Sequence, residues 1–303
     1  MRYESDWPEP RAPAVGEVTV AISHAALNFP DLLMLSGGYQ AKPPLPFIPG
    51  TEAIGIVVAV GADGSHCLGE RVIVGSLGCL AERITVPGRA VRAVPAGLTD
   101  AEAAAFTVGG LTAWVGLMVR GRLQPGDRVL VTGAGGGMGL AAVALAAHEG
   151  ARVIAAASSR ERLAAARAAG AHETLLVDRA APVIDSRDID IVFDPVGAAL
   201  CHPAIRSLRR GGRYLVIGFA GGMPPPFALN RALLKEIEIV GVRAGEAGRQ
   251  DPAAGRAHLA AIEARASALK PLIGLTVAIE DADQAFTAMA RGDLIGKAVI
   301  SIQ

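Results

Sequence analysis

Residues 129–160 constrain the fold more than any other part of the chain. A β-branched run, VLVT, is followed by GAGGGMG, by an alanine-rich segment and by a second apolar run, ARVIAAA. Glycines at the start of a helix let the backbone turn tightly and approach an anion, which the free N–H groups of the first helical turn favour. The segment therefore predicts a strand, a phosphate-binding turn, a helix and a second strand.

Within this turn, Gly133, Gly136 and Gly139 have G-x-x-G-x-x-G spacing. The flanking strand and helix give the context in which such a turn binds the pyrophosphate of a dinucleotide. No Lys-Ser or Lys-Thr follows, so the turn is not a P-loop. The alternative is a glycine-rich loop that serves packing only. We expect cofactor contacts from Gly133, Gly135, Gly136, Gly137, Met138 and Gly139.

The second strand ends in Ser158, Ser159 and Arg160, where NAD-binding chains usually have Asp or Glu to bind the ribose 2′-OH. Two hydroxyls and a guanidinium suit a 2′-phosphate, which arginine can hold in bidentate fashion. The sequence therefore predicts NADP(H). The alternative is a plain helix N-cap followed by surface charge. The two interpretations are compatible because a helix N-terminus also favours phosphate.

The whole chain divides into three parts. Residues 1–105 contain short strands and turns rich in Pro and Gly, 106–245 alternate strands and helices, and 246–303 return to the first module. Near-continuous apolar strands indicate a buried parallel sheet. We predict an α/β fold with a Rossmann dinucleotide-binding domain inserted in a β-rich substrate domain. In the middle part we expect strands at 127–132, 151–156, 173–177, 188–193, 212–217 and 237–242, and helices at 137–149, 159–169, 198–209 and 229–235.

Composition excludes several classes of protein. Lys plus Arg and Asp plus Glu both number 29, so no long-range field attracts nucleic acid or an anionic membrane. No apolar stretch is longer than one buried helix, and the first ten residues lack a signal-peptide core. The three cysteines are scattered, which argues against a disulfide framework or a structural zinc cluster. We expect a cytoplasmic protein that binds neither nucleic acid nor membrane.

Several segments carry a resemblance to a known family. They are NFPDLLMLSGGYQAKPPLPFIPGTEAIGIVVAVG (28–61), VTGAGGGMGLAAVALA (131–146), AAASSRERLAAARAAGA (155–171), FDPVG (193–197), GGRYLVIGFAGG (211–222), LNRALLKEIEIVGV (229–242) and GKAVI (296–300). Together they resemble the medium-chain dehydrogenase/reductase superfamily, in its zinc-independent NADPH:quinone oxidoreductase (zeta-crystallin-like) branch. The resemblance implies a GroES-like substrate domain around the Rossmann domain. It also implies a homodimer, which pairs through the strand in KEIEIVGV.

The zinc-dependent alcohol dehydrogenases of that superfamily carry a Cys near the position of Asn28 and a Gly-His-Glu where this chain has Gly50, Thr51 and Glu52. A catalytic zinc needs about three protein ligands of Cys, His or carboxylate type. Because the Cys and the His are absent here, we expect no zinc.

Without a metal, catalysis rests on placing the nicotinamide against an electron-poor acceptor, while polar groups stabilise or protonate its oxygen. The resemblance places Asn28, Asp31 and Tyr39 beside the nicotinamide, so they are the candidate catalytic residues. The alternatives are a loop residue that bonds its own backbone for Asn28, a helix N-cap for Asp31 and a packed turn residue for Tyr39.

Further cofactor contacts follow from the resemblance and from position at strand ends. Thr112 matches a threonine near the nicotinamide, and Gly218 and Phe219 follow a strand at the edge where α/β sheets bind ligands. Asn230 and Lys297 are additional candidates. For Lys297 the alternative is an exposed lysine at the start of a strand.

Three functions fit these features. The first is an NADPH:quinone reductase, and the second is a 2-enoyl thioester reductase, acting on acyl-CoA or a carrier-bound substrate. Arg243, Arg249 and Arg256 suggest the basic rim that a phosphopantetheine arm would use, although ordinary surface arginines are the alternative. The third is a non-catalytic NADPH-binding protein of crystallin type.

Overall fold

A computed structural model describes residues 2–62, 64 and 66–302 of the chain. By its internal contacts the chain forms two compact units, unit 1 from Met1–Val108 with Lys270–Gln303 and unit 2 from Gly109–Leu269. A unit with a parallel sheet is inserted in a β-rich unit, which confirms the predicted fold class.

The chain returns to unit 1 at residue 270, later than the boundary at 246 that we set from the sequence. The reason is the segment around helix α8 (Pro252–Glu263), which packs within unit 2. Its neighbour Arg265 stacks on the Trp114 ring at 4.6 Å and pairs with Glu149, with 2.5 Å between Nε and Oε1.

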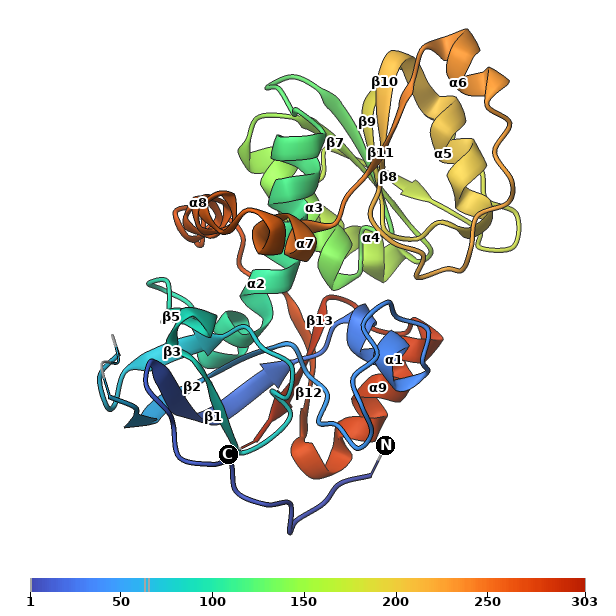
Figure 1. Cartoon of the computed structure of the whole chain (residues 1–303). Coiled ribbons are helices and arrows are strands. Elements are labelled where there is room, and N and C mark those ends of the chain that lie inside the picture. Colours follow the sequence, from blue (N-terminus) through green and yellow to red (C-terminus); the bar gives the residue numbers. More distant parts are fainter. Residues whose placement is uncertain (1, 63, 65, 303) are drawn as a thin grey trace. The chain divides into compact units, whose positions relative to one another are not determined.

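Unit 1 is built on a mainly antiparallel sheet. Its strands lie in the order β12-β13-β1-β2-β3-β5, and β4 also pairs with β1. The apolar inner residues of these strands form a core with helix α9, beside which α1 lies (Figure 1). The elements are β1 (Glu17–Ala26), α1 (Phe29–Leu35), β2 (Glu52–Val60), β3 (Arg71–Val74), β4 (Arg83–Pro87), β5 (Val91–Ala93), β12 (Ile273–Ala278), α9 (Ala282–Arg291) and β13 (Lys297–Ser301).

Unit 2 is a parallel sheet with strands in the order β11-β10-β9-β6-β7-β8. Helix α3 packs on β6 and β7, whereas α5 packs on β9 and β10 from the other side (Figure 1). The elements are β6 (Arg128–Thr132), α3 (Gly137–His148), β7 (Arg152–Ala157), α4 (Arg160–Ala168), β8 (Glu173–Leu176), β9 (Ile189–Asp194), α5 (Cys201–Ser207), β10 (Leu208–Val216), α6 (Asn230–Lys235), β11 (Glu238–Gly241), α7 (Ala244–Gln250) and α8.

The expected strands and helices of unit 2 are present, but one pair has different bounds. A helix expected over 198–209 is a 3₁₀ turn at Ala198–Leu200 followed by α5, and the next strand begins at Leu208 rather than 212. Leu208 is already extended and pairs with Ile189, and Gly211, with φ of 71°, interrupts the pairing before it resumes at Arg213. The short strand β5 and the helix α7 were not predicted.

Helix α2 (Asp100–Trp114) begins in unit 1 and continues into unit 2 as a π-helical turn, η2 (Val115–Arg120). Within the described ranges, Asp100–Arg120 is the one helix long and apolar enough to cross a membrane, although 61% of its apolar window is buried inside the structure. That degree of burial is what a core helix has.

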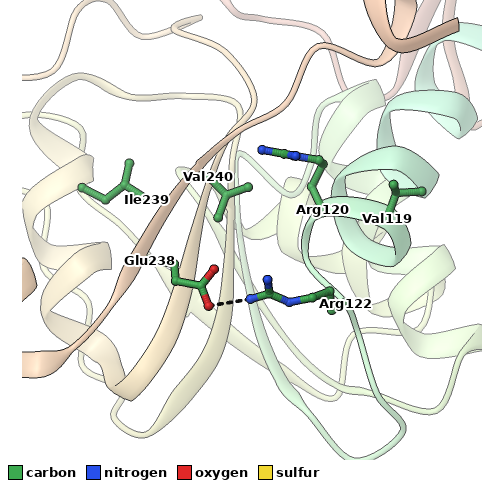
Figure 2. A pocket seen from close by; sticks show the side chains of 6 residues that line it. All are labelled: Val119, Arg120, Arg122, Glu238, Ile239 and Val240. Atoms are coloured by element: carbon green, nitrogen blue, oxygen red, sulfur yellow. Dashed lines mark hydrogen bonds and ion pairs between the residues drawn. The ribbon is translucent and has the colours of Figure 1, made fainter. Parts of the chain in front are cut away.

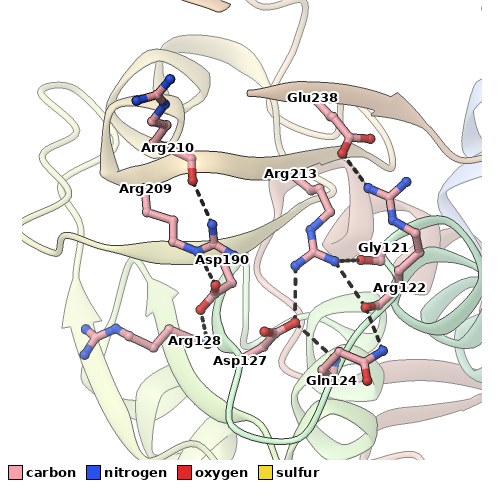
Figure 3. A network of polar contacts seen from close by, with 10 residues as sticks. All are labelled: Gly121, Arg122, Gln124, Asp127, Arg128, Asp190, Arg209, Arg210, Arg213 and Glu238. Carbon is pink, nitrogen blue, oxygen red and sulfur yellow. Dashed lines mark hydrogen bonds and ion pairs between the residues drawn. The ribbon is translucent and has the colours of Figure 1, made fainter. Parts of the chain in front are cut away.

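A buried arginine donates hydrogen bonds to the backbone just after η2. Arg213 of β10 donates hydrogen bonds to the carbonyls of Gly121 and Arg122, and its guanidinium lies 3.3 Å from the carboxylate of Asp127 (Figure 3). The last carbonyls of a helix have no intrahelical donors, so Arg213 satisfies groups that burial would otherwise penalise.

Candidate functional site

The glycine turn lies between β6 and α3, as predicted. Gly133 has φ of 59°, in the left-handed region that favours glycine, and Gly136 is the extended N-cap residue of α3. A Cβ on Gly139 would lie 2.3 Å from the Gly133 carbonyl, so this glycine lets the helix pack against the turn. Backbone conformation explains Gly133 and packing explains Gly139, two of the three glycines in the motif.

Gly136 is different, because a Cβ there would meet only the Gly133 carbonyl oxygen, at an ordinary 3.6 Å. Neither its φ of −87° nor a protein neighbour requires glycine at this position. The first turn of α3, with Gly137 and Met138, supplies N–H groups that have no intrahelical partner. Because Gly136 has no side chain, an anionic group can approach these donors closely.

The end of β7 carries the predicted hydroxyls and cation. Ser159 is the N-cap of α4, and its Oγ accepts a hydrogen bond from the Arg162 N–H at 3.3 Å. Ser158 is half-buried, and Arg160 is exposed at the first position of the helix. The N-cap interpretation is therefore confirmed for Ser159, and it leaves the phosphate interpretation open because both use the same helix end.

Other predicted cofactor residues lie around unit 2. Gly218 and the 41% exposed Phe219 follow β10, and the position of a Cβ on Gly197 would be 2.9 Å from the Phe219 ring. The loop after β9 thus packs against the loop after β10. Thr112 is half-buried in α2, and Asn230 is exposed at the start of α6.

Unit 1 contains a buried polar cluster made by Asn28, Glu52 and Lys297. The Lys297 Nζ lies 2.6 Å from Asn28 Oδ1 and 2.8 Å from Glu52 Oε1, and the Asn28 amide nitrogen donates to the same Glu52 oxygen at 3.0 Å. Glu52 Oε2 accepts the Val108 N–H at 2.8 Å. The three polar side chains are therefore hydrogen-bonded to one another. The Asn28 amide has a single orientation, because its oxygen accepts from Lys297 and its nitrogen donates to Glu52.

Two expectations change with this geometry. Lys297 does begin strand β13, but it is 7% exposed and ion-paired, so it is not the solvent-exposed lysine of our alternative. Its ammonium is bonded within unit 1, to Asn28 and Glu52, which argues for a structural part in this cluster.

Asp31 lies in the first turn of α1 with no exposed surface. Its Oδ2 accepts the Asn28 N–H at 2.8 Å, whereas its Oδ1 has no hydrogen-bond partner. Burial raises the pKa of this carboxyl to about 6, against the lowering effects of the Asn28 N–H and the Lys297 charge. Asp31 is therefore a third-position capping residue of α1, with Asn28 as the N-cap, rather than the N-cap itself.

Tyr39 lies apart from these hydrogen bonds, half-buried in the bend after α1. The structure thus brings Asn28 and Asp31 together, and Glu52 and Lys297 lie in the same cluster.

Glu52 was not predicted as a site residue. A carboxylate at the head of the apolar strand EAIGIVVAV was the available signal, because a charge that enters a buried strand needs a partner.

The residues of this cluster do not fit a zinc ion. Across residues 2–62, 64 and 66–302, no group of three or more His, Cys, Asp or Glu side chains is placed to hold a metal. Asn28 and Thr51 stand near Glu52, and the Lys297 ammonium already occupies the carboxylate that would face a cation. A second cation there would be repelled at close range.

A surface pocket lies at strand β11, on the edge of the parallel sheet, and contains none of the predicted catalytic residues. Arg122, two residues after η2, pairs with Glu238 of β11, 2.5 Å between Nη2 and Oε1 (Figure 2). Val119, Arg120, Arg122, Glu238, Ile239 and Val240 line it.

The basic rim suggested for a phosphopantetheine arm is partly neutralised, because Arg243 and Arg249 both contact Glu246.

Comparison with known proteins identifies the family of this chain. Residues 14–115 match the family model for the alcohol dehydrogenase GroES-like domain, and residues 137–260 match that for the zinc-binding dehydrogenase. Quinone oxidoreductase-like protein 2 of Rattus norvegicus is 34% identical over 305 residues, covering 97% of this chain and 87% of the relative.

Solved structures give the same result. The quinone oxidoreductase of Thermus thermophilus, solved also with NADPH, is 32% identical with a TM-score of 0.83, covering 98% of this chain and 95% of that one. A mycobacterial protein in complex with NADPH is 27% identical with a TM-score of 0.87, covering 98% and 94%. The chain belongs to the medium-chain dehydrogenase/reductase superfamily of oxidoreductases, and within it to the quinone oxidoreductase-like branch.

One further relative is named for a different function. The mycocerosic acid synthase-like polyketide synthase of Mycobacterium tuberculosis is 36% identical over 222 residues. The match covers 68% of this chain but 10% of that protein.

Proposed function

We propose that this chain is an NADPH-dependent, zinc-independent oxidoreductase that reduces a quinone or a similar electron-poor acceptor conjugated to a carbonyl. The observation that carries the proposal is Gly136, a glycine that neither φ nor packing requires, at the head of a helix after a parallel strand. Bound NADPH would supply a hydride to the acceptor.

Unit 2 contains the residues that we propose for the cofactor. Backbone N–H groups of Gly135, Gly137, Met138 and Gly139 would hold the pyrophosphate, which the bare Gly136 lets approach, and Ser158, Ser159 and Arg160 would hold the 2′-phosphate. Thr112, Gly218, Phe219 and Asn230 are proposed further contacts, whereas Lys297 is proposed as a support for Asn28. The two NADPH-bound structural neighbours support this choice of cofactor.

In unit 1, we assign Tyr39 to contact the acceptor carbonyl and to donate a hydrogen bond or a proton to its oxygen. Asn28 precedes it on the same stretch of chain: Asp31 accepts the Asn28 backbone N–H, and Glu52 and Lys297 fix the Asn28 side-chain amide. The Tyr39 hydroxyl would stabilise the charge that develops on the acceptor oxygen.

Reduction of a 2-enoyl thioester is the second candidate. The polyketide synthase relative favours it, while the pairing of Arg243 and Arg249 with Glu246 weakens the case for a basic rim. A crystallin-type protein that binds NADPH without turnover is the third interpretation.

Oxidation of NADPH, followed at 340 nm with a benzoquinone, a naphthoquinone, an enone and crotonyl-CoA, separates these functions. We expect fastest turnover with a quinone. Preference for crotonyl-CoA would establish the second candidate, and binding of NADPH without any turnover would establish the third.

An Arg160→Ala variant should lose roughly tenfold in NADPH affinity and little in NADH affinity, since it removes a charge-assisted contact to the 2′-phosphate.

We also propose a homodimer that forms through β11, with a cytoplasmic location as predicted from the cysteine pattern. Strand β11 ends the sheet, and Ile239 on it is 46% exposed. An edge strand with exposed apolar side chains favours pairing with another strand. Light scattering at micromolar concentration measures the mass, and a monomer would contradict the proposal.

A further inference from the structure

Asp194, the last residue of β9, is 1% exposed, and its side chain is bonded to two neighbouring strands and to the loop that follows β9. Its Oδ1 accepts hydrogen bonds from the Thr132 hydroxyl at 2.5 Å and from the Val196 and Gly197 N–H groups at 2.8 and 3.0 Å. Its Oδ2 accepts one from the Tyr214 hydroxyl. Thr132 ends β6 and Tyr214 belongs to β10, so one carboxylate connects the central strands of the sheet.

The partners of Asp194 are adjacent to two segments of the expected cofactor site, the glycine turn and the loop after β10. Thr132 precedes Gly133, where a Cβ would lie 2.7 Å from Val196, so the loop after β9 is in close contact with the glycine turn. The Asp194 carbonyl accepts the N–H groups of Ile217 and Gly218, at 3.1 and 3.4 Å. Asp194 therefore bonds the residue before the glycine turn through its side chain and the loop after β10 through its backbone.

From this geometry we infer that Asp194 is a positioning residue, which sets the spacing between the glycine turn and the Gly218–Gly222 loop. The inference rests on the proposed function, because the glycine turn is the proposed contact for the pyrophosphate and the loop carries Gly218 and Phe219, two further proposed cofactor contacts. The adenosine end of the cofactor, at Ser158–Arg160, follows β7, which Asp194 does not contact through any of these bonds. Loss of Asp194 should therefore weaken the hold on one half of NADPH only.

Both side-chain oxygens of Asp194 are essential to this role. Four donors converge on them, three on Oδ1 and one on Oδ2. In an Asp194→Asn variant, one acceptor oxygen becomes an NH₂ group, and at least one of the four donors must turn away. A shift of the Thr132 end or of the Tyr214 end would alter the spacing.

The test compares binding of NADPH with binding of adenosine 2′-monophosphate, which lacks the 5′-phosphate that the glycine turn would hold, by calorimetry on the full-length protein. We expect Asp194→Asn to raise the Kd for NADPH about tenfold and to leave the Kd for the monophosphate within about twofold. Asp190→Asn is the matched control. Asp190 lies near the start of the same strand and bonds Arg209 and the Arg128 N–H, so both Kd values should stay within about twofold (Figure 3).

An equal loss for both ligands would show a merely structural role and overturn the inference, and so would unchanged binding of both. If the wild type binds neither ligand, the proposed function itself is wrong. If Asp194→Asn does not fold, Thr132→Val decides, because it removes one donor and keeps the side-chain shape. We then expect about a threefold rise in the NADPH Kd alone, and equal effects on both ligands would again overturn the inference.

Discussion

Asp194 in unit 2 and Asp31 in unit 1 are both buried aspartates beside a candidate site, but their oxygens are bonded differently. Both oxygens of Asp194 accept hydrogen bonds, whereas Asp31 Oδ1 has no partner. Lys297 influences Asp31 only through its charge, since its direct bonds go to Asn28 and Glu52. The comparison teaches that burial alone does not determine what a carboxylate contributes, because donors at each oxygen decide the cost of its charge.

The largest expected effect comes from breaking the ion pair in the unit 1 cluster. Lys297→Met leaves Glu52 buried and without its cation, which should lower the free energy of unfolding by about 3–5 kcal/mol. Urea denaturation measures this loss, and hydrogen exchange should place it in unit 1.

Lys42→Met is the control for this prediction, since Lys42 is an exposed lysine of the same unit. The double variant Glu52→Gln with Lys297→Met should recover much of the loss, because no unpaired charge remains. A loss below about 1 kcal/mol for Lys297→Met alone would mean that the pair is not needed.

A smaller effect, of opposite sign, is expected at Asp31. Its pKa is raised to about 6 from 3.8, mainly by burial, so the folded state binds the proton more tightly than the unfolded state. The free energy of unfolding of the wild type therefore falls as pH rises between these values. The loss remains at higher pH, where the buried carboxyl is ionised. Asp31→Asn, which mimics the neutral acid, should stabilise the protein by roughly 2 kcal/mol at pH 7.5 and hardly at all at pH 4.

Unfolding free energies of both proteins at the two pH values check this prediction. An equal destabilisation at both would show that the carboxylate is needed for its shape or for its bond to Asn28. The nearby charges oppose each other, because Lys297 lowers the pKa of Asp31 and Glu52 raises it.

The smallest effect is expected where a polar contact is partly exposed. Ser159→Ala removes the N-cap bond to Arg162 and should destabilise α4 by about 1 kcal/mol, read from hydrogen exchange of its first amides. Ser158→Ala is the control, because Ser158 is not the N-cap. An equal effect of the two would contradict the assignment of the cap.

Local features were predictable from the sequence. The glycine turn, the N-cap near Ser158 and Ser159, and the strand–helix alternation each depend on residues a few positions apart, where backbone rules apply directly. The Asn28 bond to Asp31 is of the same kind, three residues apart.

The long-range contacts were not predictable. Lys297 is 269 positions from Asn28 and 245 from Glu52, and they meet because β13 and β2 both pair with β1. Asp194 reaches Thr132, 62 positions earlier, because β9 lies next to β6. Which strands become neighbours is set by the topology of the sheet, and no spacing in the sequence states it.

Gly135 has a consequence for protein engineering. A Cβ at this position would lie 2.4 Å from the Cβ of Arg162, so the turn and the first turn of α4 share one small volume. A designer who redirects cofactor preference through residues 158–162 is therefore not free to treat that segment alone. Each choice at 162 also decides which side chains position 135 accepts, and the two sites should be varied together in any library.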